Sequence, residues 1–388
     1  MYKITTIAPT PFFADRGAHV RILEEIKALI ALGNEISICT YHNGRNIQNL
    51  DIHRIPNIPW YNKLDAGPSY HMFYLDLLLL LKSLMHVHNT GPDIIHAHLH
   101  EGAFIGKFCS TMENIPVVFD LQGSFSDEIS AHGFIKRDGI PYKITHRFEE
   151  LLCTLPDAII VSSSRMVSVL KQEFNVNGGK IFVVEDGVDT DVFKPNIEVS
   201  NLRKSLNIPL NKKIVAFLGL LNEYQGVDYL LKSIPLVLKE IKDVHFLIMG
   251  YPNVDKYKAM AKKLGINDSV TFTGRVDYNR ASEYLALGYI SVSPKISETE
   301  SNGKLYLYMA SGLPTVVFDN QVNKSILGDL GVYAKSKDRV SFANGIVKLL
   351  EDKELTKKLS IKVREKAVKD YSWKYVGEKI INIYNEIL

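Results

Sequence analysis

The densest group of chemically capable side chains in this 388-residue sequence lies in the segment SETESNGK, residues 297–304. Acidic, hydroxyl, amide and ammonium groups occur together there: Glu298, Glu300, Ser301, Asn302, Gly303 and Lys304. Such a mixture can bind a ligand that carries both hydroxyl groups and phosphates. A simpler interpretation stays open, in which Glu298 and Ser301 only cap the helix that follows.

The flanking residues predict which elements position this segment. An apolar strand pattern precedes it, a helical pattern follows it, and a second strand pattern begins after Gly312 and Pro314. In a parallel α/β sheet, such a loop lies at the carboxyl end of a strand and the amino end of a helix, where backbone N–H groups and the helix dipole attract anions. We therefore expect a ligand site at residues 298–304.

Length and composition restrict the class of protein. A chain of 388 residues exceeds one ordinary core and predicts two domains. A net charge of +3 with 23% charged residues does not indicate a nucleic-acid partner. The three cysteines lack metal-site spacing, and Met1 leads into a strand pattern instead of a signal peptide, so we expect a cytoplasmic protein without structural disulfides.

The most apolar stretch is FYLDLLLLLKSL, residues 73–84. Asp76 and Lys82 interrupt it, and it falls short of the roughly 20 apolar residues that span a bilayer. We predict a core helix. Contact with a membrane surface stays open, although no face rich in Lys and Arg supports it.

Strand and helix patterns alternate along both halves of the chain. This alternation predicts an α/β protein with two Rossmann-like, doubly wound parallel-sheet domains, at residues 1–195 and 196–372, facing each other across a ligand cleft. Residues 373–388 are predicted to be a C-terminal helix that packs back on the first domain. Arg16 and Gly17 precede the first helix, where glycine permits close backbone approach to a ligand or simply a tight turn.

Three histidines, at positions 96, 98 and 100, alternate at the end of one strand pattern. Alternation predicts that they share one face of the strand, and three imidazoles can bind zinc. No Cys, Asp or Glu follows at ligand spacing, so hydrogen bonding is favoured and no metal site is assigned. The next strand pattern ends at Asp120 and Gln122, which we expect at the same sheet edge.

In the order and spacing of its motifs, the chain resembles the family-4 glycosyltransferases of the GT-B fold. The motifs are PDIIHAH (92–98), KIFVVEDGVDTDVFKP (180–195), VTFTG (270–274), MASGLPTVV (309–317) and the Tyr-Ser-Trp that ends at Trp373. The resemblance implies a retaining hexosyltransferase without cofactor or metal. It also implies that the carboxy-terminal domain binds a nucleotide-sugar and the amino-terminal domain binds the acceptor: a glycan, a lipid-linked sugar or a small molecule.

The chain departs from the family pattern on the donor side. Where the family has an arginine and a lysine that clamp the diphosphate, this chain has Leu220 and Gln225. Leu307 stands at the position of the ribose-binding glutamate, and Gln122 replaces a histidine. We hypothesise that three cations on neighbouring loops take over the phosphates: Arg275, Lys295 and Lys304. Alternatively, they are surface cations that balance Glu298 and Glu300.

The expected roles follow from this hypothesis. Glu300 or Glu298 orients the donor sugar, and Gln122 lies near the reaction centre. The donor-binding residues are Gly219, Arg275, Lys295, Ser301, Asn302, Gly303 and Lys304. The acceptor-side residues are Arg16, Gly17, His98 and Asp120. Two alternatives stay open: a non-catalytic homologue that acts as a carbohydrate-binding or partner subunit, and a phosphorylase or epimerase-like enzyme acting on sugar phosphates.

Overall fold

The computed structural model describes residues 1–14, 17–64, 69–131, 135–137, 139–296 and 301–388. The chain forms two compact units: residues 1–186 with 373–388, here called the amino unit, and residues 187–372, the carboxy unit. The sequence-based division at residue 195 thus differs from the structural one, which places residues 187–195 in the carboxy unit. Among the described residues, no helix is long and apolar enough to cross a membrane.

The amino unit contains a parallel seven-stranded sheet in the order β3-β2-β1-β4-β5-β6-β7. Its strands are β1 (Lys3–Ala8), β2 (Glu35–Thr40), β3 (Asp51–Arg54), β4 (Ile94–His98), β5 (Val117–Leu121), β6 (Ala158–Val161) and β7 (Ile181–Val183). The central strands β4, β5 and β6 are buried on both faces; most of their residues are apolar, and the buried polar exceptions are His96, His98 and Asp120.

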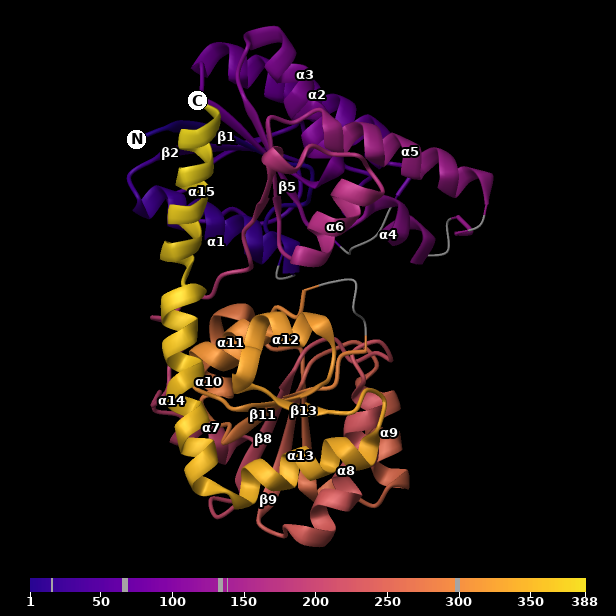
Figure 1. Ribbon diagram of the computed structural model, residues 1–388, viewed down its shortest axis with the longest axis vertical. Coiled ribbons are helices and arrows are strands. Elements are labelled where there is room, and N and C mark those ends of the chain that lie inside the picture. Colours follow the sequence, from indigo (N-terminus) through magenta and orange to yellow (C-terminus); the bar gives the residue numbers. More distant parts are fainter. Residues whose placement is uncertain (15–16, 65–68, 132–134, 138, 297–300) are drawn as a thin grey trace. The chain divides into compact units, whose positions relative to one another are not determined.

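Helices cover both faces of this sheet. They are α1 (Gly17–Ala31), α2 (Met72–Thr90), α3 (Leu99–Glu113), α4 (Phe125–Ala131), α5 (Ile140–Thr154), α6 (Ser164–Gln172) and α15 (Trp373–Ile387). Alternate residues of the same strands pack against α1 and α15 on one side and against α2 and α3 on the other. Figure 1 shows α15 alongside α1. Gly377 favours their close approach, because a Cβ there would lie only 3.2 Å from the Cβ of Ala28 on α1.

The carboxy unit contains a parallel six-stranded sheet in the order β10-β9-β8-β11-β12-β13. Its strands are β8 (Lys213–Leu218), β9 (Val244–Met249), β10 (Val270–Gly274), β11 (Ile290–Ser293), β12 (Thr315–Phe318) and β13 (Val332–Ala334). Its helices are α7 (Ser200–Ser205), α8 (Val227–Glu240), α9 (Val254–Lys263), α10 (Ala281–Leu285), α11 (Lys304–Ala310), α12 (Gln321–Leu327), α13 (Arg339–Glu351) and α14 (Lys353–Asp370).

The two parallel sheets confirm the predicted pair of doubly wound Rossmann-like domains. One local prediction was wrong. Strand β4 ends at His98 and Leu99 adopts a left-handed φ of 61°, so His100 belongs to α3 and not to the strand. The leucine-rich helix α2 packs into the core along one side, as predicted, and exposes Phe73 and Leu77 on the other.

Candidate functional site

In each unit the strand order reverses between two adjacent strands, β1 and β4 in the amino unit and β8 and β11 in the carboxy unit. Connections after these strands leave to opposite sides, which creates a crevice at the carboxyl edge where α/β proteins bind ligands. The loops that carry most of the predicted site residues follow β8, β11, β4 and β5. The fold therefore places most of the predicted donor-side residues at the switch point of the carboxy unit and most of the predicted acceptor-side residues at the switch point of the amino unit.

Lys304 is the central residue of the carboxy-unit site. It stands in the first turn of α11, and its ammonium donates a hydrogen bond to Gln225 Oε1, in the loop between β8 and α8. The same nitrogen lies 4.7 Å from the centroid of the Phe217 ring. A Cβ at Gly219 would come within 2.7 Å of Lys304 Nζ, so glycine makes room for this amine at the end of β8.

A second lysine lies near Lys304. The Lys295 side chain is buried, with 3% of its surface exposed, and its ammonium donates to the Ser301 carbonyl over 2.8 Å. Burial, together with the nearby charge of Lys295, lowers the pKa of Lys304 from 10.5 to about 7. The site thus holds two amines whose positive charges disfavour one another, as expected for a site that receives an anion.

Gly226 fixes the approach of α8 to this loop. It adopts a φ of +72°, and a Cβ there would lie 1.9 Å from the Pro294 carbonyl oxygen. Asn222 Oδ1 accepts a hydrogen bond from the Gln225 backbone N–H at 3.2 Å, which holds the turn before the helix. The amino end of α8, with its partial positive charge, is therefore held against the loop that follows β11.

Asn302 anchors the loop after β11. The Asn302 amide is buried and donates to Ser293 Oγ at 3.0 Å and to Asn323 Oδ1 at 2.8 Å. Among the described residues, Ser301 Oγ is buried without a hydrogen-bond partner. Gly303 precedes α11 as its cap residue. The Asn302 side chain thus holds the loop in place, whereas the Ser301 hydroxyl takes no part in these contacts.

The remaining predicted residues on this side are less closely grouped. Arg275 follows β10, two strands away from β8, is exposed, and its guanidinium lies 5.4 Å from the Tyr251 ring centroid. Glu298 and Glu300, the predicted sugar-orienting acids, lie outside the described residues, as does Arg16 on the acceptor side. Their roles stay predictions.

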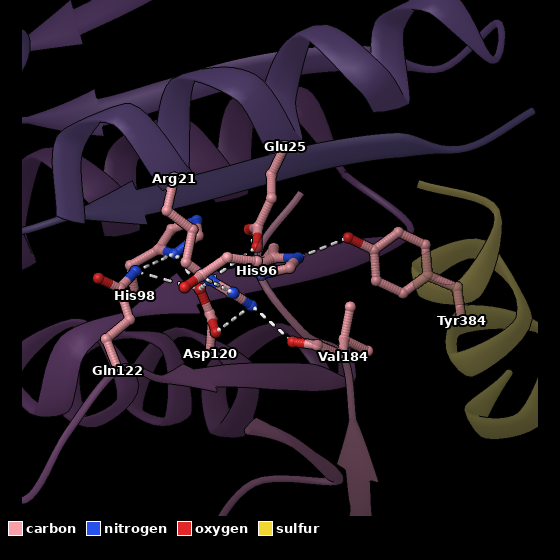
Figure 2. Close-up of polar contacts among 9 residues, drawn as sticks. Arg21, Glu25, His96, His98, Asp120, Gln122, Val184 and Tyr384 are labelled. Atoms are coloured by element: carbon pink, nitrogen blue, oxygen red, sulfur yellow. Dashed lines mark hydrogen bonds and ion pairs between the residues drawn. The ribbon is translucent and has the colours of Figure 1, made fainter. Parts of the chain in front are cut away.

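The amino-unit site is a buried ionic network centred on Arg21 of α1 (Figure 2). Its guanidinium binds both carboxylate oxygens of Asp120, at 3.0 and 3.1 Å, and donates to Asp186 Oδ1 at 2.6 Å. Arg21 Nε also lies 2.9 Å from Glu25 Oε1, one helical turn away on α1. One cation thus joins α1 to the ends of β5 and β7.

The burial of this network shifts the pKa values of its members. Burial alone would raise the pKa of Asp120, but the charge of Arg21 and the contacts with His98 outweigh it and hold the pKa well below its usual range. Burial raises the pKa of Glu25 well above its usual value, and Arg21 opposes this only in part. Asp120 is therefore ionised at neutral pH, whereas burial disfavours the ionised form of Glu25.

The three histidines separate into different environments. His96 and His98 stack, with ring centroids 4.7 Å apart, and His98 Nδ1 lies 3.0 Å from Asp120 Oδ2. His96 Nδ1 lies 2.6 Å from Tyr384 Oη on α15, and burial lowers the pKa of His96 to about 3. His100 lies elsewhere, 3.3 Å from Glu149.

Gln122 lies at the outer side of the Arg21 network and is partly buried, and its amide donates to Asp120 Oδ2 at 3.1 Å. His98 and Asp120 are buried, at 1% and 0% exposure, so they orient Gln122 rather than present themselves to a ligand. Gly17 begins α1. The structure thus brings Gln122, His98 and Asp120 together, with Gln122 outermost.

Four side chains of this network have the composition of a metal site. Glu25, His96, His98 and Asp120 offer ligand atoms within 4.8 Å of one another. Arg21 already contacts both carboxylates, so its guanidinium takes the position of a cation between them. A metal ion would have to displace Arg21 or lie against its charge. The four side chains are therefore better suited to surround the Arg21 guanidinium than to bind a metal ion.

Sequence reasoning missed Arg21, Glu25, Glu149 and Tyr384. Glu149 is buried and accepts hydrogen bonds from the backbone N–H groups of Phe125 and Ser126, at 2.8 and 3.0 Å, which fixes the start of α4 beside Gln122. One signal was available: Arg21 and Glu25 are charged residues at helical spacing i, i+4 on the apolar face of a helix.

Comparison with known proteins agrees with this description. Residues 198–366 match the family model described as glycosyl transferases group 1, and residues 16–192 match the model described as Glycosyltransferase Family 4. A relative in sequence is the D-inositol 3-phosphate glycosyltransferase of Corynebacterium diphtheriae, 23% identical over 77% of this chain and 72% of the relative.

Two solved structures share the fold along the whole chain. Sucrose-phosphate synthase from Thermosynechococcus elongatus has a TM-score of 0.80 at 17% identity and covers 100% of this chain and 99% of its own. Anabaena HepE, in complex with UDP and glucose, has a TM-score of 0.76 at 16% identity and covers 100% of both chains.

Proposed function

Because the chain belongs to the family-4 glycosyltransferases of the GT-B fold, we propose that it transfers a hexose from a nucleotide-sugar to an acceptor, with retention of anomeric configuration and without a metal. The carboxy unit binds the donor and the amino unit binds the acceptor. The relatives named above support glycosyl transfer, and HepE, solved with UDP and glucose, supports a nucleotide-sugar as donor.

The contact between Lys304 and Gln225 is the observation that carries this proposal. The resemblance places a diphosphate-binding lysine at position 225, where this chain has glutamine. Lys304 extends from the first turn of α11, and its ammonium contacts the Gln225 side chain at the end of β8. A cation is thus retained at the point where the donor's diphosphate is expected, although it comes from another position in the sequence.

The leaving group of a nucleotide-sugar is a nucleoside diphosphate, whose charge increases as the glycosidic bond breaks. Lys304, Lys295 and the amino end of α8 supply positive potential for that charge without a metal. The negative charge of a bound diphosphate also offsets the repulsion between Lys295 and the charged form of Lys304. The two lysines therefore bind the anion jointly.

Retention requires no strong base on the amino unit. In the proposed step, the bond between sugar C1 and the phosphate oxygen breaks, C1 bonds to the acceptor oxygen on the same face, and the departing phosphate takes the acceptor proton. Gln122 cannot shuttle a proton, but its amide can orient an acceptor hydroxyl while Asp120 and His98 hold that amide in place.

A panel of nucleotide-sugars tests the proposal. We expect at least one to raise the melting temperature of the chain and, with an acceptor panel, to yield a product whose anomeric proton coupling shows retention. If a carbohydrate or a partner protein stabilises the chain while no nucleotide or nucleotide-sugar does, it is a non-catalytic binding subunit.

A further inference from the structure

Helix α2 exposes an apolar stripe on the side that faces away from the sheet. Phe73, Leu77, Leu81 and Met85 follow one another at intervals of four residues and are 82%, 57%, 50% and 59% exposed. The opposite side of the same helix is buried against the sheet. An ordinary surface helix places polar residues on its outer side, so α2 is apolar where it contacts solvent.

Helices α3 and α5 have the same feature. On α3, Phe104, Phe108 and Met112 are exposed at intervals of four residues. On α5, the exposed apolar residues are Ile140, Ile144, Phe148 and Leu151. All three helices therefore present apolar side chains away from the core at helical spacing.

The three stripes lie on one face of the amino unit. Helix α3 packs against both α2 and α5, and all three cover the side of the sheet opposite α1 and α15. Figure 1 shows α2 and α3 together, with α5 continuing the layer. With exposed fractions near one half, these side chains present roughly 1,000 Å² of apolar surface, above the roughly 300–600 Å² of the largest patch on a typical monomer.

Charged groups of both signs surround this apolar face. Arg147 pairs with Glu150 on α5, His88 lies 2.9 Å from Glu113, and Lys107 Nζ lies 3.9 Å from Asp157. An apolar centre with a polar rim of mixed charge is typical of a protein–protein interface. A rim with charges of both signs can also pair with the same rim of a second copy of the chain, whereas two rims of one sign would repel each other.

We propose that the face formed by the outer sides of α2, α3 and α5 is the interface of a homodimer, in which it packs against the same face of a second copy. The area of this face supports a second copy as its partner. If roughly 1,000 Å² is buried on each subunit, the total is roughly 2,000 Å², which is the size of a stable homodimer interface. A twofold axis brings the same stripe of each copy together and buries it. This inference does not depend on the proposed function.

The same features argue against an anionic membrane as the occupant. Membrane-surface helices carry an excess of Lys and Arg beside the apolar side, which attracts acidic headgroups. Here the rim cations Arg147 and Lys107 pair with carboxylates, which reduces that attraction.

Sedimentation velocity across a wide dilution series tests the proposal on the full chain. We expect the wild type to sediment at twice its 43.8 kDa mass at high concentration. The double variant Leu77→Glu/Ile144→Glu should sediment as the 43.8 kDa monomer, because each copy brings new charges into a buried apolar interface. Both positions are exposed, so the variant should retain the wild-type circular dichroism spectrum.

A matched control is Ile361→Glu, which changes an exposed isoleucine on α14 and should leave the dimer intact. A wild type that remains monomeric at every concentration would overturn the proposal, and so would a double variant that stays dimeric. A monomeric wild type that pellets with lipid vesicles, when the double variant does not, would assign the face to a membrane instead.

Discussion

The Lys304 ammonium donates its hydrogen bond to the side-chain carbonyl of Gln225, so the start of α11 and the loop after β8 meet at the strand-order reversal of the carboxy unit. In the family pattern the cation stands at position 225 itself. We interpret the pair as a transposed diphosphate contact: the positive charge has moved to another residue while its location in space is retained.

Moving the lysine from position 304 to position 225 tests this transposition. Lys304→Met should weaken nucleotide-sugar binding, and adding Gln225→Lys to it should restore most of the affinity, because the ammonium then returns from the other loop. We expect the double variant to bind within about threefold of the wild type, a coupling that a double-mutant cycle measures. If the double variant binds the nucleotide-sugar no more tightly than Lys304→Met does, an ammonium group at this location is not sufficient for binding.

Donor binding should depend on pH through Lys304. Its pKa is lowered to about 7, so at pH 8 to 9 the Lys304 amine of the free protein is mostly neutral, and it must take up a proton to pair with a diphosphate. We expect affinity to increase as pH falls from 9 to 6, and heats of binding at pH 8 to vary with the ionisation enthalpy of the buffer. A flat pH profile would contradict this assignment.

The same pKa predicts how stability varies with pH in the free protein. Between about pH 7 and 10.5 the unfolded chain holds a proton on Lys304 that the folded chain does not, so this residue makes stability rise with pH in that range. Lys304→Met should remove this contribution. Urea unfolding at pH 7 and pH 9 should therefore show a smaller increase for the variant than for the wild type.

Gly226→Ala should disturb the donor site through the backbone. The new Cβ would meet the Pro294 carbonyl oxygen and separate α8 from the loop after β11, at a cost of roughly 1–3 kcal/mol of stability, with weaker donor binding. Gly265→Ala is the matched control, since its φ of +66° carries the same strain but no atom lies within 4 Å of the new Cβ. Equal losses in both variants would attribute the effect to strain alone.

Asp120→Asn should destabilise the amino unit by roughly 3–5 kcal/mol, because Arg21 would remain buried with its main counter-ion removed. The low pKa of Asp120 means that its stabilisation is present at neutral pH and is lost only as the pH falls through acidic values. Asp319→Asn, which removes an exposed pair with Lys324, should cost less than about 1 kcal/mol. Urea unfolding of both variants makes the comparison.

Periodicity was sufficient to predict the two sheets, because buried parallel strands are continuous apolar runs separated by helical patterns. It could not locate the end of β4, where Leu99 turns into a left-handed conformation and directs His100 toward Glu149. Nor could it show that α2 is apolar on both sides, since a leucine-rich helix looks the same whether or not a second layer covers it.

Contacts between side chains from distant positions were harder to predict. Lys304 was singled out for its place in a polar loop, but its contact with Gln225 depends on how far α8 approaches the loop after β11. The Arg21 network joins residues more than 90 positions apart, and Tyr384 reaches His96 from the last helix. Such pairs depend on how whole helices and strands pack together. The local sequence pattern carries no information about that packing.

The central claim is that Lys304 holds the diphosphate of a nucleotide-sugar, and calorimetric titration of the purified chain with UDP-glucose and other nucleotide-sugars tests it most directly. The account predicts saturable binding of at least one of them that weakens at least about tenfold in Lys304→Met, the loss of one charge-assisted contact. Lys324→Met, which removes an exposed lysine on α12, should bind as the wild type does. Equal affinity of wild type and Lys304→Met for the same nucleotide-sugar, or no binding of any, would contradict the account.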